Sequence, residues 1–402
     1  MNESSYDWII IGGGASGLFA AVNAAKSGAK VLVLEKTNKL LAKVKISGGG
    51  RCNVTHACFE VPKLVQFYPR GHQELKPVFK QFNPKHTIEW FENRGVKLKT
   101  EADGRMFPVS NQSQTIIDCL LKEANTYNVN IKTNCLIESI ESTSSGFEIN
   151  YIGGSCSGKK LLLATGGNLK GVLRDYLLKT GHTFVEEVPS LFTFNIPNHT
   201  ILALSGVAVE SAKVSIVGSA FNSTGPLLIT HWGLSGPAVL RLSAWAAREI
   251  HQWHNHFNIT VNWLPHFDEQ QFRSWFQSFR SEFGSKRVSS KNPFELPNRL
   301  WDYLLQQLNL PENLNWADLN KEQLKQLIRV LLNHPFEIKG KTTYKEEFVT
   351  CGGISLDVVQ LKTMSSKLVP NLYFAGEVLN IDGITGGFNF QFAWSSGWIA
   401  VQ

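Results

Sequence analysis

Trp-Ile-Ile-Ile-Gly-Gly-Gly-Ala-Ser-Gly, residues 8–17, is the stretch of sequence that decides the fold. A short apolar run meets glycines with the spacing G-x-G-x-x-G, and the apolar residues 18–21 then begin a helix. A second apolar run, residues 30–34, ends at Glu35, which follows Gly17 by 18 positions. About 20 residues are expected between such glycines and a ribose-binding carboxylate. The stretch therefore predicts a βαβ unit that binds a dinucleotide with a free ribose 2′-hydroxyl. A 2′-phosphate, as in NADP, is disfavoured because Glu35 would repel it.

The glycines of this motif have separate physical roles. Gly12 permits the tight turn at the strand end, Gly14 lets the backbone approach a pyrophosphate, and Gly17 lets the helix pack closely on the strands. The phosphates would lie against the free N–H groups of Ala15 and Ser16 at the helix N-terminus. There the helix dipole amounts to about half a positive charge.

Composition limits the class of protein. A chain of 402 residues with 43% hydrophobic content can bury a large core and suggests two or three domains. Residues 1–7 are polar and partly acidic, and no apolar segment reaches about 18 residues, so we expect no secretory signal, no membrane span and a cytoplasmic location. The six cysteines are scattered without a C-x-x-C pair, which favours reduced, buried thiols and no metal site.

The net charge of +7 and the pI of about 9.0 have two interpretations. A basic chain can bind nucleic acid, but no block of Lys and Arg and no RNA-binding signature supports that partner. We therefore favour a solvated surface with basic residues around an anionic cofactor.

The chain changes character along its length. Residues 1–190 have a mixed α/β pattern, 191–266 and 330–340 have short strand patterns, and 267–329 has helical patterns before α/β character returns at 341–402. We predict an α/β protein whose discontinuous Rossmann-like domain contains an inserted β-barrel-like domain and a small helical insert.

Local patterns predict individual elements within these regions. Apolar spacing predicts a helix over 113–127, and the aromatic residues between 272 and 283 fall on one helical face. A terminal helix over 392–400 is expected after the C-terminal glycine loop. Asn320 with Gln323 is typical of a helix cap. Strands are expected over 129–131, 135–137, 146–151 and 159–163, with a Gly/Ser turn at 153–158.

Three further segments carry glycines where a large ligand would need close approach. Residues 46–55 contain Gly-Gly-Gly-Arg, in which Arg51 could neutralise phosphate or orient a substrate anion. Residues 161–167 form an apolar strand that ends in Thr165 and Gly166, whose small side chains leave room for a dinucleotide. Residues 372–391 contain Phe-Ala-Gly-Glu and then Thr-Gly-Gly before the last helix, whose N-terminus would face negative charge.

Together these motifs resemble the FAD-binding flavoproteins of the glutathione-reductase type, and in detail the HI0933-like (YhiN/BaiN-type) family. The resemblance covers essentially the whole chain. It rests on residues 47–53, 230–237, 350–353, 363–367 and the C-terminal block. It implies bound FAD and oxidoreductase activity.

The resemblance also implies FAD contacts at particular positions. The adenosine and diphosphate side would be held by Gly12, Gly14, Ala15, Ser16, Gly17, Glu35, Lys36 and Lys43, with Leu136 by the adenine. The flavin side would be held by Gly49, Gly50, Arg51, Gly376, Glu377, Gly387, Phe388, Asn389 and Gln391. Thr165 and Gly166, at the end of the strand 161–163, would lie beside the dinucleotide.

The chain departs from the family pattern at several positions. His56 stands where Asn is expected, Cys351 where Ala is usual, and Asn380 where Asp is usual. Phe388 and Phe390 replace Tyr and Leu. The lost hydroxyl and carboxylate put an acid–base role at these positions in doubt, but binding of FAD through backbone groups is unaffected.

The working hypothesis is an FAD-dependent oxidoreductase that reduces a small organic substrate. NADH or NADPH would bind transiently and supply the electrons. A substrate with an activated C=C bond is the first candidate. An RNA-modifying flavoprotein and a flavin-binding protein without turnover are the alternatives. A disulfide reductase is disfavoured because no second βαβ fingerprint exists and Cys52 and Cys58 lack the C-x-x-x-x-C spacing. We interpret His231 as a structural histidine of a turn and assign no catalytic residue.

Overall fold

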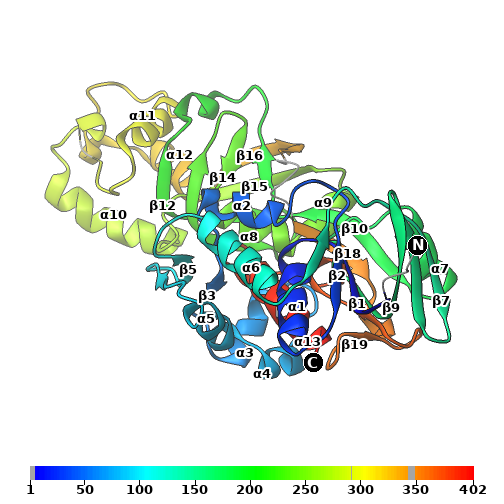
Figure 1. Cartoon of the computed structure of the whole chain (residues 1–402). Helices are drawn as coiled ribbons and strands as arrows, with labels where there is room; N and C mark the ends of the chain where they lie inside the picture. Colours follow the sequence, from blue (N-terminus) through cyan, green and yellow to red (C-terminus); the bar gives the residue numbers. More distant parts are fainter. Residues whose placement is uncertain (1–4, 291, 343–348) are drawn as a thin grey trace. The chain divides into compact units, whose positions relative to one another are not determined.

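The computed structural model describes residues 5–290, 292–342 and 349–402 (Figure 1). Residues 1–4 of the polar N-terminal segment and residues 343–348 of the expected return to α/β structure lie outside this range. The chain divides into two compact units, a first unit of Met1–Ser190 and Tyr344–Gln402 and a second unit of Leu191–Thr343. Each unit is described by itself below.

The first unit is built on a mixed sheet whose central strands are parallel. The strand order is β19-β20-β21-β9-β1-β2-β6, and β7 and β8 join through β9. The parallel strands are β1 (Ser5–Ile11), β2 (Val31–Leu34), β6 (Asn130–Lys132), β9 (Gly154–Leu163) and β21 (Leu372–Phe374). The antiparallel strands are β7 (Ile137–Thr143), β8 (Gly146–Tyr151), β19 (Val359–Gln360) and β20 (Ser365–Ser366).

Register brings the carboxyl ends of the parallel strands to one edge. Ile11 lies opposite Leu34 on one side and Leu163 on the other, Leu163 lies opposite Phe374, and Leu34 lies opposite Lys132. These residues form one row across five strands. Residues that follow the row therefore lie at one edge of the sheet, where doubly wound folds bind ligands.

Two helices pack closely beside this sheet, α1 (Ala15–Lys26) and α13 (Phe388–Ala400). A Cβ on Gly397 would lie 2.6 Å from the carbonyl oxygen of Ser16, so only glycine allows this approach. The other elements of the unit are α2 (Ala42–Gly50), β3 (Thr55–His56), α3 (Val61–Leu64), η1 (Val65–Phe67), α4 (Lys76–Gln81), α5 (Pro84–Glu92), β4 (Leu98–Thr100), β5 (Arg105–Pro108), α6 (Gln114–Thr126), α7 (Val172–Lys179), β10 (Phe184–Ser190), β18 (Val349–Ile354), η5 (Leu356–Val358) and η6 (Gly376–Val378).

The second unit contains an antiparallel sheet with strand order β16-β15-β12-β13-β14-β11-β17 in its described residues. The strands are β11 (Thr193–Asn195), β12 (Ala208–Ile216), β13 (Asn222–Ile229), β14 (Gly233–Ser235), β15 (His256–Asn262), β16 (His334–Lys339) and β17 (Lys341–Thr342). The helices are η2 (Thr200–Leu204), α8 (Pro237–Trp245), α9 (Ala247–Gln252), α10 (Glu269–Phe283), η3 (Val288–Ser290), α11 (Asn298–Gln306), η4 (Trp316–Asp318) and α12 (Lys321–Leu332).

One hydrophobic cluster joins this sheet to α10, α11 and α12. Phe272, Phe276 and Phe279 are buried on one face of α10, so the predicted aromatic face is packed inside the unit. The predicted cap of α12 is confirmed, because Asn320 and Gln323 form a reciprocal capping box.

Three sequence predictions were wrong at element boundaries. Residues 135–136 are not strand, because Cys135 donates its N–H to the carbonyl of Glu35 at 2.9 Å and β7 begins only at Ile137. Residues 154–158 belong to β9 and pair with β8, so the expected Gly/Ser turn shrinks to Ile152 and Gly153. The last helix begins at Phe388 and not at residue 392, because it is capped by Gly387.

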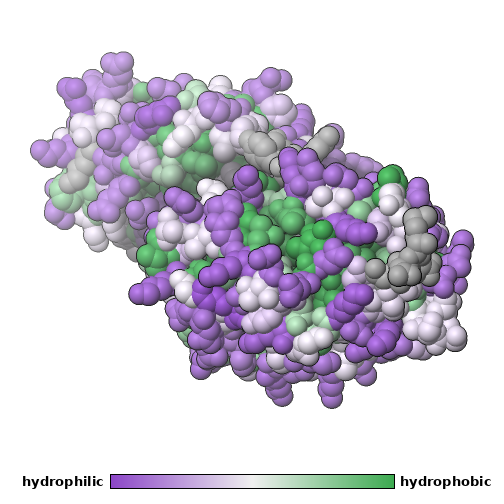
Figure 2. Space-filling view, viewed as in Figure 1, coloured by the Kyte–Doolittle hydropathy of each residue, from purple (hydrophilic) through white to green (hydrophobic). Residues whose placement is uncertain are grey.

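The viewed surface is mainly hydrophilic, with apolar side chains gathered in the region where Figure 1 labels β2 (Figure 2). Within the described ranges, no helix has both the length and the apolarity needed to span a bilayer.

All six cysteines are free, and five are buried, but Cys58 is half-buried, so the expectation of burial was wrong there.

Candidate cofactor-binding site

The glycine motifs meet at the carboxyl edge of the parallel sheet. Gly12 follows β1, and a Cβ on it would lie 2.4 Å from the carbonyl oxygen of Ala164, which follows β9. The hydroxyl of Ser16 at the start of α1 donates to the carbonyl of Ala375, which follows β21, at 3.4 Å. The N–H of Gly376 donates to Ser396 of α13 at 2.9 Å. Segments that are far apart in the sequence thus form one continuous site.

The N-terminus of α1 leaves donors and space for an anion. Gly14 is its N-cap and provides no side-chain hydrogen bond, whereas α5, α10 and α12 are closed by capping boxes. The bond from Leu18 N–H to Gly14 carbonyl is the first of the helix, so the preceding N–H groups lie before the helical ladder. No atom lies within 4 Å of a Cβ built on Gly14, whereas one on Gly17 would lie 2.0 Å from the Gly12 carbonyl oxygen.

Glu35 is held at the end of β2 beside this loop. One carboxylate oxygen accepts from the N–H of Gly13 at 2.8 Å, and the other accepts from the N–H and hydroxyl of Thr37 at 2.9 and 2.8 Å. Each oxygen has further lone-pair capacity for a ribose hydroxyl. Leu136 follows Cys135, whose N–H donates to the backbone carbonyl of Glu35. Leu136 is 53% exposed. It therefore offers an exposed apolar side chain in the segment that is hydrogen-bonded to the end of β2.

Charged residues around the site are partly paired with one another. Lys43 Nζ lies 2.5 Å from an oxygen of Glu377, whose other oxygen accepts the N–H of Thr350 at 2.8 Å. Lys36 is exposed. Arg51 donates to Glu101 at 2.6 Å, and its guanidinium lies 4.0 Å from the ring centroid of Phe107. These contacts hold α2 against β5 and η6.

Three more glycines of the expected set are open. Gly49 and Gly50 have φ values of +68° and +82°, Gly166 has +76°, and no atom lies within 4 Å of a Cβ built on any of them. Although α2 extends to Gly50, the dihedral angles of residues 47–49 are not helical. Thr165, before Gly166, donates to that residue's carbonyl at 3.3 Å.

The N-terminus of α13, like that of α1, has no side-chain cap. Gly387 has a φ of +92°, and a Cβ there would lie 2.5 Å from the carbonyl oxygen of Thr55, so glycine is required. The helical ladder begins with the bond from Gln391 N–H to Gly387 at 2.9 Å. The ring of Phe388 stacks between His56 and Phe67, with centroid distances of 4.7 and 4.4 Å.

The side chains of Asn389 and Gln391 are engaged inside the protein. Asn389 accepts from the N–H of Gly383 and donates to its carbonyl, each at 2.8 Å. Gln391 is fully buried and accepts from Thr55 and Thr87 at 2.6 and 2.9 Å. These two residues therefore shape the helix start, and of their backbone N–H groups only that of Asn389 precedes the helical ladder.

Cys52 has no features of a redox nucleophile. It is fully buried, and burial raises the pKa of its thiol to about 12, so the reactive thiolate is scarce at neutral pH. Burial also raises the pKa of the Cys58 thiol. Burial and the raised pKa values of both thiols therefore disfavour a redox pair.

The motif around His231 forms a corner of the sheet in the second unit. The hydroxyl of Thr230 donates to the carbonyl of Gly233 at 3.0 Å and accepts its N–H at 3.2 Å. A Cβ on Gly233 would lie 1.9 Å from the carbonyl oxygen of Phe194. His231 itself is exposed. Packing thus accounts for the glycine and threonine of this motif.

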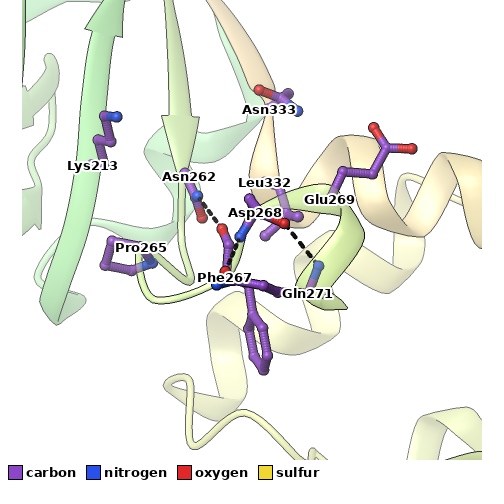
Figure 3. Close-up of a pocket in the computed structure, with 9 residues that line it drawn as sticks. All are labelled: Lys213, Asn262, Pro265, Phe267, Asp268, Glu269, Gln271, Leu332 and Asn333. Atoms are coloured by element: carbon purple, nitrogen blue, oxygen red, sulfur yellow. Dashed lines mark hydrogen bonds between the residues drawn. The ribbon is translucent and has the colours of Figure 1, made fainter. Parts of the chain in front are cut away.

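A hollow of about 360 Å³ in the second unit is a different kind of feature (Figure 3). It is lined by residues of β12, β15, α10 and the end of α12. Asp268 accepts the N–H of Gln271 at 2.7 Å, and Asn262 donates to the carbonyl of Phe267 at 3.2 Å. These groups are already engaged, and none of the glycine motifs contributes to the lining.

The residues at the sheet edge fit a dinucleotide in shape and charge. The open glycines leave room for a backbone approach, the N-termini of α1 and α13 present N–H donors, and Glu35 presents a carboxylate that can accept from a hydroxyl group. A family model described as the HI0933-like protein Rossmann domain matches residues 6–402. The chain belongs to the HI0933-like family.

Curated relatives of this HI0933-like chain are similar over nearly their whole length. The ribosomal RNA dihydrouridine synthase of Escherichia coli (strain K12) is 31% identical, over 99% of this chain and 97% of the relative. The 3-dehydro-bile acid delta(4,6)-reductase of Clostridium scindens is 28% identical, over 97% of each chain. The Haemophilus influenzae ribosomal RNA dihydrouridine synthase is also 28% identical, over 97% of this chain and 96% of the relative.

Solved structures share the fold. The 3-ketosteroid delta1-dehydrogenase of Sterolibacterium denitrificans has a TM-score of 0.53 at 12% identity, over 99% of this chain and 98% of that one. The 3-ketosteroid-delta4-(5alpha)-dehydrogenase of Rhodococcus jostii RHA1 has a TM-score of 0.50 at 12% identity, over 99% and 97%. The HI0933-like chain is a flavoprotein oxidoreductase with a Rossmann-type FAD-binding domain, which confirms the fold class and family expected from its motifs.

Arg70 and Asp382 are the residues that the sequence prediction missed. They form a buried ion pair beside the start of α13, although 312 positions separate them. Asp382 lies inside the quoted C-terminal block, but nothing in the sequence near Arg70 marks it as a partner.

Proposed function

We propose that this HI0933-like chain is an FAD-dependent reductase of a C=C bond conjugated to a carbonyl group, with NADH or NADPH as electron donor. The observation that carries the proposal is the row of paired residues at the ends of the parallel strands, formed by Ile11, Leu34, Leu163 and Phe374. Because of this register, the glycine motifs that follow these strands lie at one edge of the sheet.

The residues of this edge divide into two sets under the proposal. Gly12 to Gly17 bind the diphosphate through backbone N–H groups, Glu35 accepts from the adenosine ribose, and Leu136 covers the adenine. Lys36 and Lys43 add positive charge to this half of the site.

The second set orients the flavin half. Gly49, Gly50 and Gly166 leave space for a planar ring, and the N–H groups at the start of α13 point toward negative charge that develops on it. When bound, FAD supplies hydride transfer, for which the chain supplies orientation and electrostatics. Arg51, Thr165, Gly376, Glu377, Gly387, Phe388, Asn389 and Gln391 complete this half.

The names of the relatives support the substrate class. Dihydrouridine is uridine whose 5,6 double bond, next to a ring carbonyl, has been saturated. A 3-dehydro-bile acid with a double bond at carbon 4 carries that bond next to the 3-keto group. Both relatives therefore act on a C=C bond activated by a carbonyl, the bond type that accepts hydride. Since no second βαβ fingerprint exists in the sequence, the nicotinamide would bind transiently.

Reduction of uridine in RNA is a second candidate. The Escherichia coli relative with this named activity is 31% identical and matches end to end. The basic pI of about 9.0 agrees with a polyanionic substrate, although the sequence has no concentrated block of Lys and Arg.

An anaerobic titration tests both candidates. The purified protein should show a flavin spectrum, lose its absorbance with NADH or NADPH, and regain it with one acceptor class. A conjugated enone steroid is compared with its saturated ketone, and a uridine-containing rRNA fragment with the same fragment in which dihydrouridine replaces uridine. Recovery with neither acceptor would contradict the reductase proposal and support a binding protein without turnover. A colourless protein that cannot be reconstituted with FAD would overturn the proposal altogether.

A further inference from the structure

Residues 67–70 hold the loop that precedes α13. The N–H of Ile384 donates to the carbonyl of Phe67 at 2.9 Å, and the hydroxyl of Tyr68 donates to the carbonyl of Phe388 at 2.7 Å. Arg70 and Asp382 form an isolated antiparallel bridge. The backbone of the loop is therefore fixed at both ends by one short segment.

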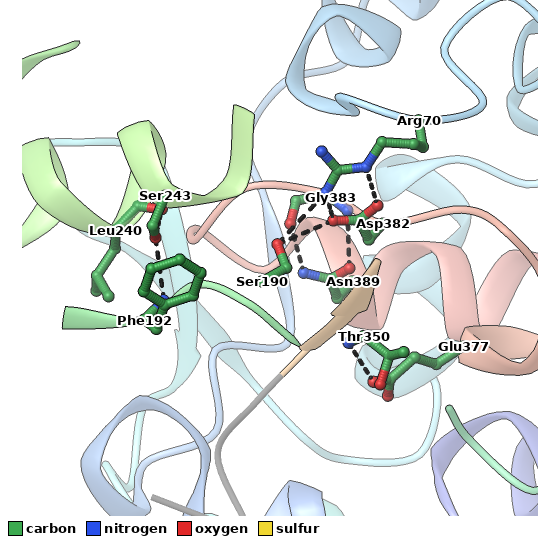
Figure 4. A network of polar contacts seen from close by, with 10 residues as sticks. All are labelled: Arg70, Ser190, Phe192, Leu240, Ser243, Thr350, Glu377, Asp382, Gly383 and Asn389. Carbon is green, nitrogen blue, oxygen red and sulfur yellow. Dashed lines mark hydrogen bonds and ion pairs between the residues drawn. The ribbon is translucent and has the colours of Figure 1, made fainter. Parts of the chain in front are cut away.

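Arg70 and Asp382 are the charged part of this contact (Figure 4). Arg70 Nε lies 2.5 Å from one oxygen of Asp382, and its Nη2 contacts the other oxygen. Ser190 donates to the same carboxylate at 3.0 Å. Asp382 is fully buried and the Arg70 side chain is 12% exposed. Solvent therefore screens this pair weakly.

The ion pair is one residue from a tightly constrained glycine. Gly383 is held at its N–H and carbonyl by Asn389, the second residue of α13 (Figure 4). A Cβ on Gly383 would lie 2.8 Å from Cβ of Phe388, the first residue of the helix. Displacement of Asp382 would therefore be transmitted to the start of α13.

The charges of the pair balance each other. Burial raises the pKa of Asp382, and the facing guanidinium of Arg70 opposes this effect. With both partners present, the helix start experiences little net charge from the pair. If one partner is removed, the other remains as an unpaired charge close to the uncapped N-terminus of α13, and its sign depends on which partner was removed.

We propose that Arg70 and Asp382 are positioning residues that fix the N-terminal amides of α13 against the flavin and keep the local charge neutral, and that they thereby set FAD affinity and the midpoint potential of the bound flavin. This inference rests on the proposed FAD site. It concerns residues that need not touch the cofactor.

Opposite substitutions separate this role from simple stabilisation. Asp382→Asn leaves a positive charge and should raise the midpoint potential. Arg70→Gln leaves the Asp382 carboxyl unpaired and should lower the potential at a pH high enough to keep that carboxyl ionised. Each variant should weaken FAD binding about tenfold. A tenfold change in the ratio of affinities for reduced and oxidised FAD corresponds to about 30 mV for a two-electron couple. Arg70→Lys, which keeps the charge, should return the potential toward that of the wild type.

A matched control is available in the first unit. Arg94 and Glu123 form a partly buried ion pair at 2.6 Å with exposed fractions of 11% and 15%. Glu123→Gln should reduce thermal stability and leave FAD affinity and potential unchanged. FAD affinity is measured by flavin fluorescence during reconstitution, and the potential by equilibration with reference dyes.

The outcomes separate the two proposals. Failure of the wild type to bind FAD overturns the proposed function itself. If the wild type binds FAD but both variants shift the potential in the same direction, or not at all, the positioning role is wrong. If Asp382→Asn does not fold, Arg70→Gln and Arg70→Lys still decide the matter, because the inference requires them to differ in potential.

Discussion

Glu35 links the end of β2 to the glycine loop through the N–H of Gly13, and it is the residue through which the ribose is expected to bind. Glu35→Ala removes a charge-assisted acceptor, so FAD binding should weaken by roughly 1–3 kcal/mol. Flavin fluorescence during reconstitution measures this change. Glu141→Gln, on an exposed position of β7, is the matched control and should bind like the wild type. Equal affinity for Glu35→Ala and the wild type would refute the ribose role.

Two glycines of the first motif should respond differently to alanine. Gly14 has open space at its Cβ position and an ordinary φ of −84°, so Gly14→Ala should leave the melting temperature of the apoprotein unchanged. It should weaken FAD binding at least tenfold, or about 1.4 kcal/mol, because the methyl group occupies the diphosphate approach.

Gly17→Ala tests packing at the same loop. Its Cβ would lie 2.0 Å from the carbonyl oxygen of Gly12, so the helix must shift and the protein should lose about 1–3 kcal/mol of stability. Thermal unfolding of the apoprotein measures this loss. A Gly17→Ala apoprotein as stable as the wild type would show that the close approach of α1 is not required.

At the scale of elements, the cap of α12 is a structural contact outside the candidate site. Asn320 closes α12 by accepting the N–H of Gln323 at 2.9 Å. Asn320→Ala should destabilise the protein by about 1 kcal/mol without changing FAD affinity, and Asn320→Asp should restore most of that stability. Chemical denaturation measures both variants. A change in FAD affinity would contradict the assignment of this cap to structure alone.

Among the helices predicted from the sequence, α13 has the least accurate start. Its residues are buried around most of the helix, including Phe388, Gln391 and Trp394, so no apolar face marks where it begins. The start depends on Gly387, whose conformation follows from its close approach to Thr55. By contrast, α6 and α12 each have one exposed face. The predicted bounds of α6 agree with the structure within one residue at each end, and α12 begins directly after its predicted cap, Asn320.

For the whole molecule, a buried histidine makes stability depend on pH. His334 is 6% exposed, and burial, with His199 and Arg329 nearby, lowers its pKa from 6.5 to about 4. It accepts the indole N–H of Trp263 at 3.2 Å, so it is held neutral. Below pH 6.5 the unfolded chain binds a proton that the folded protein does not bind. Stability should therefore fall as the pH decreases from 6.5 to 4, by up to roughly 3 kcal/mol.

Urea unfolding at a series of pH values measures this dependence. His334→Asn should lose most of the slope between pH 4 and 6.5, although its stability at pH 7 is also reduced. His254→Asn changes an exposed histidine and should keep the wild-type slope. An unchanged slope in His334→Asn would show that other groups are responsible.

The sequence by itself determined the Rossmann-type class, the family and the candidate cofactor, because the G-x-G-x-x-G spacing and Glu35 act within one short βαβ unit. Local spacing is sufficient there because Gly12 and Gly17 are each required by a close backbone contact, and Gly14 leaves open space at the start of the helix. Only the tertiary structure brought Arg70 to Asp382 and buried the side chain of Gln391 between Thr55 and Thr87. Such contacts join residues hundreds of positions apart, and they are decided by how strands and helices pack, for which no local pattern exists.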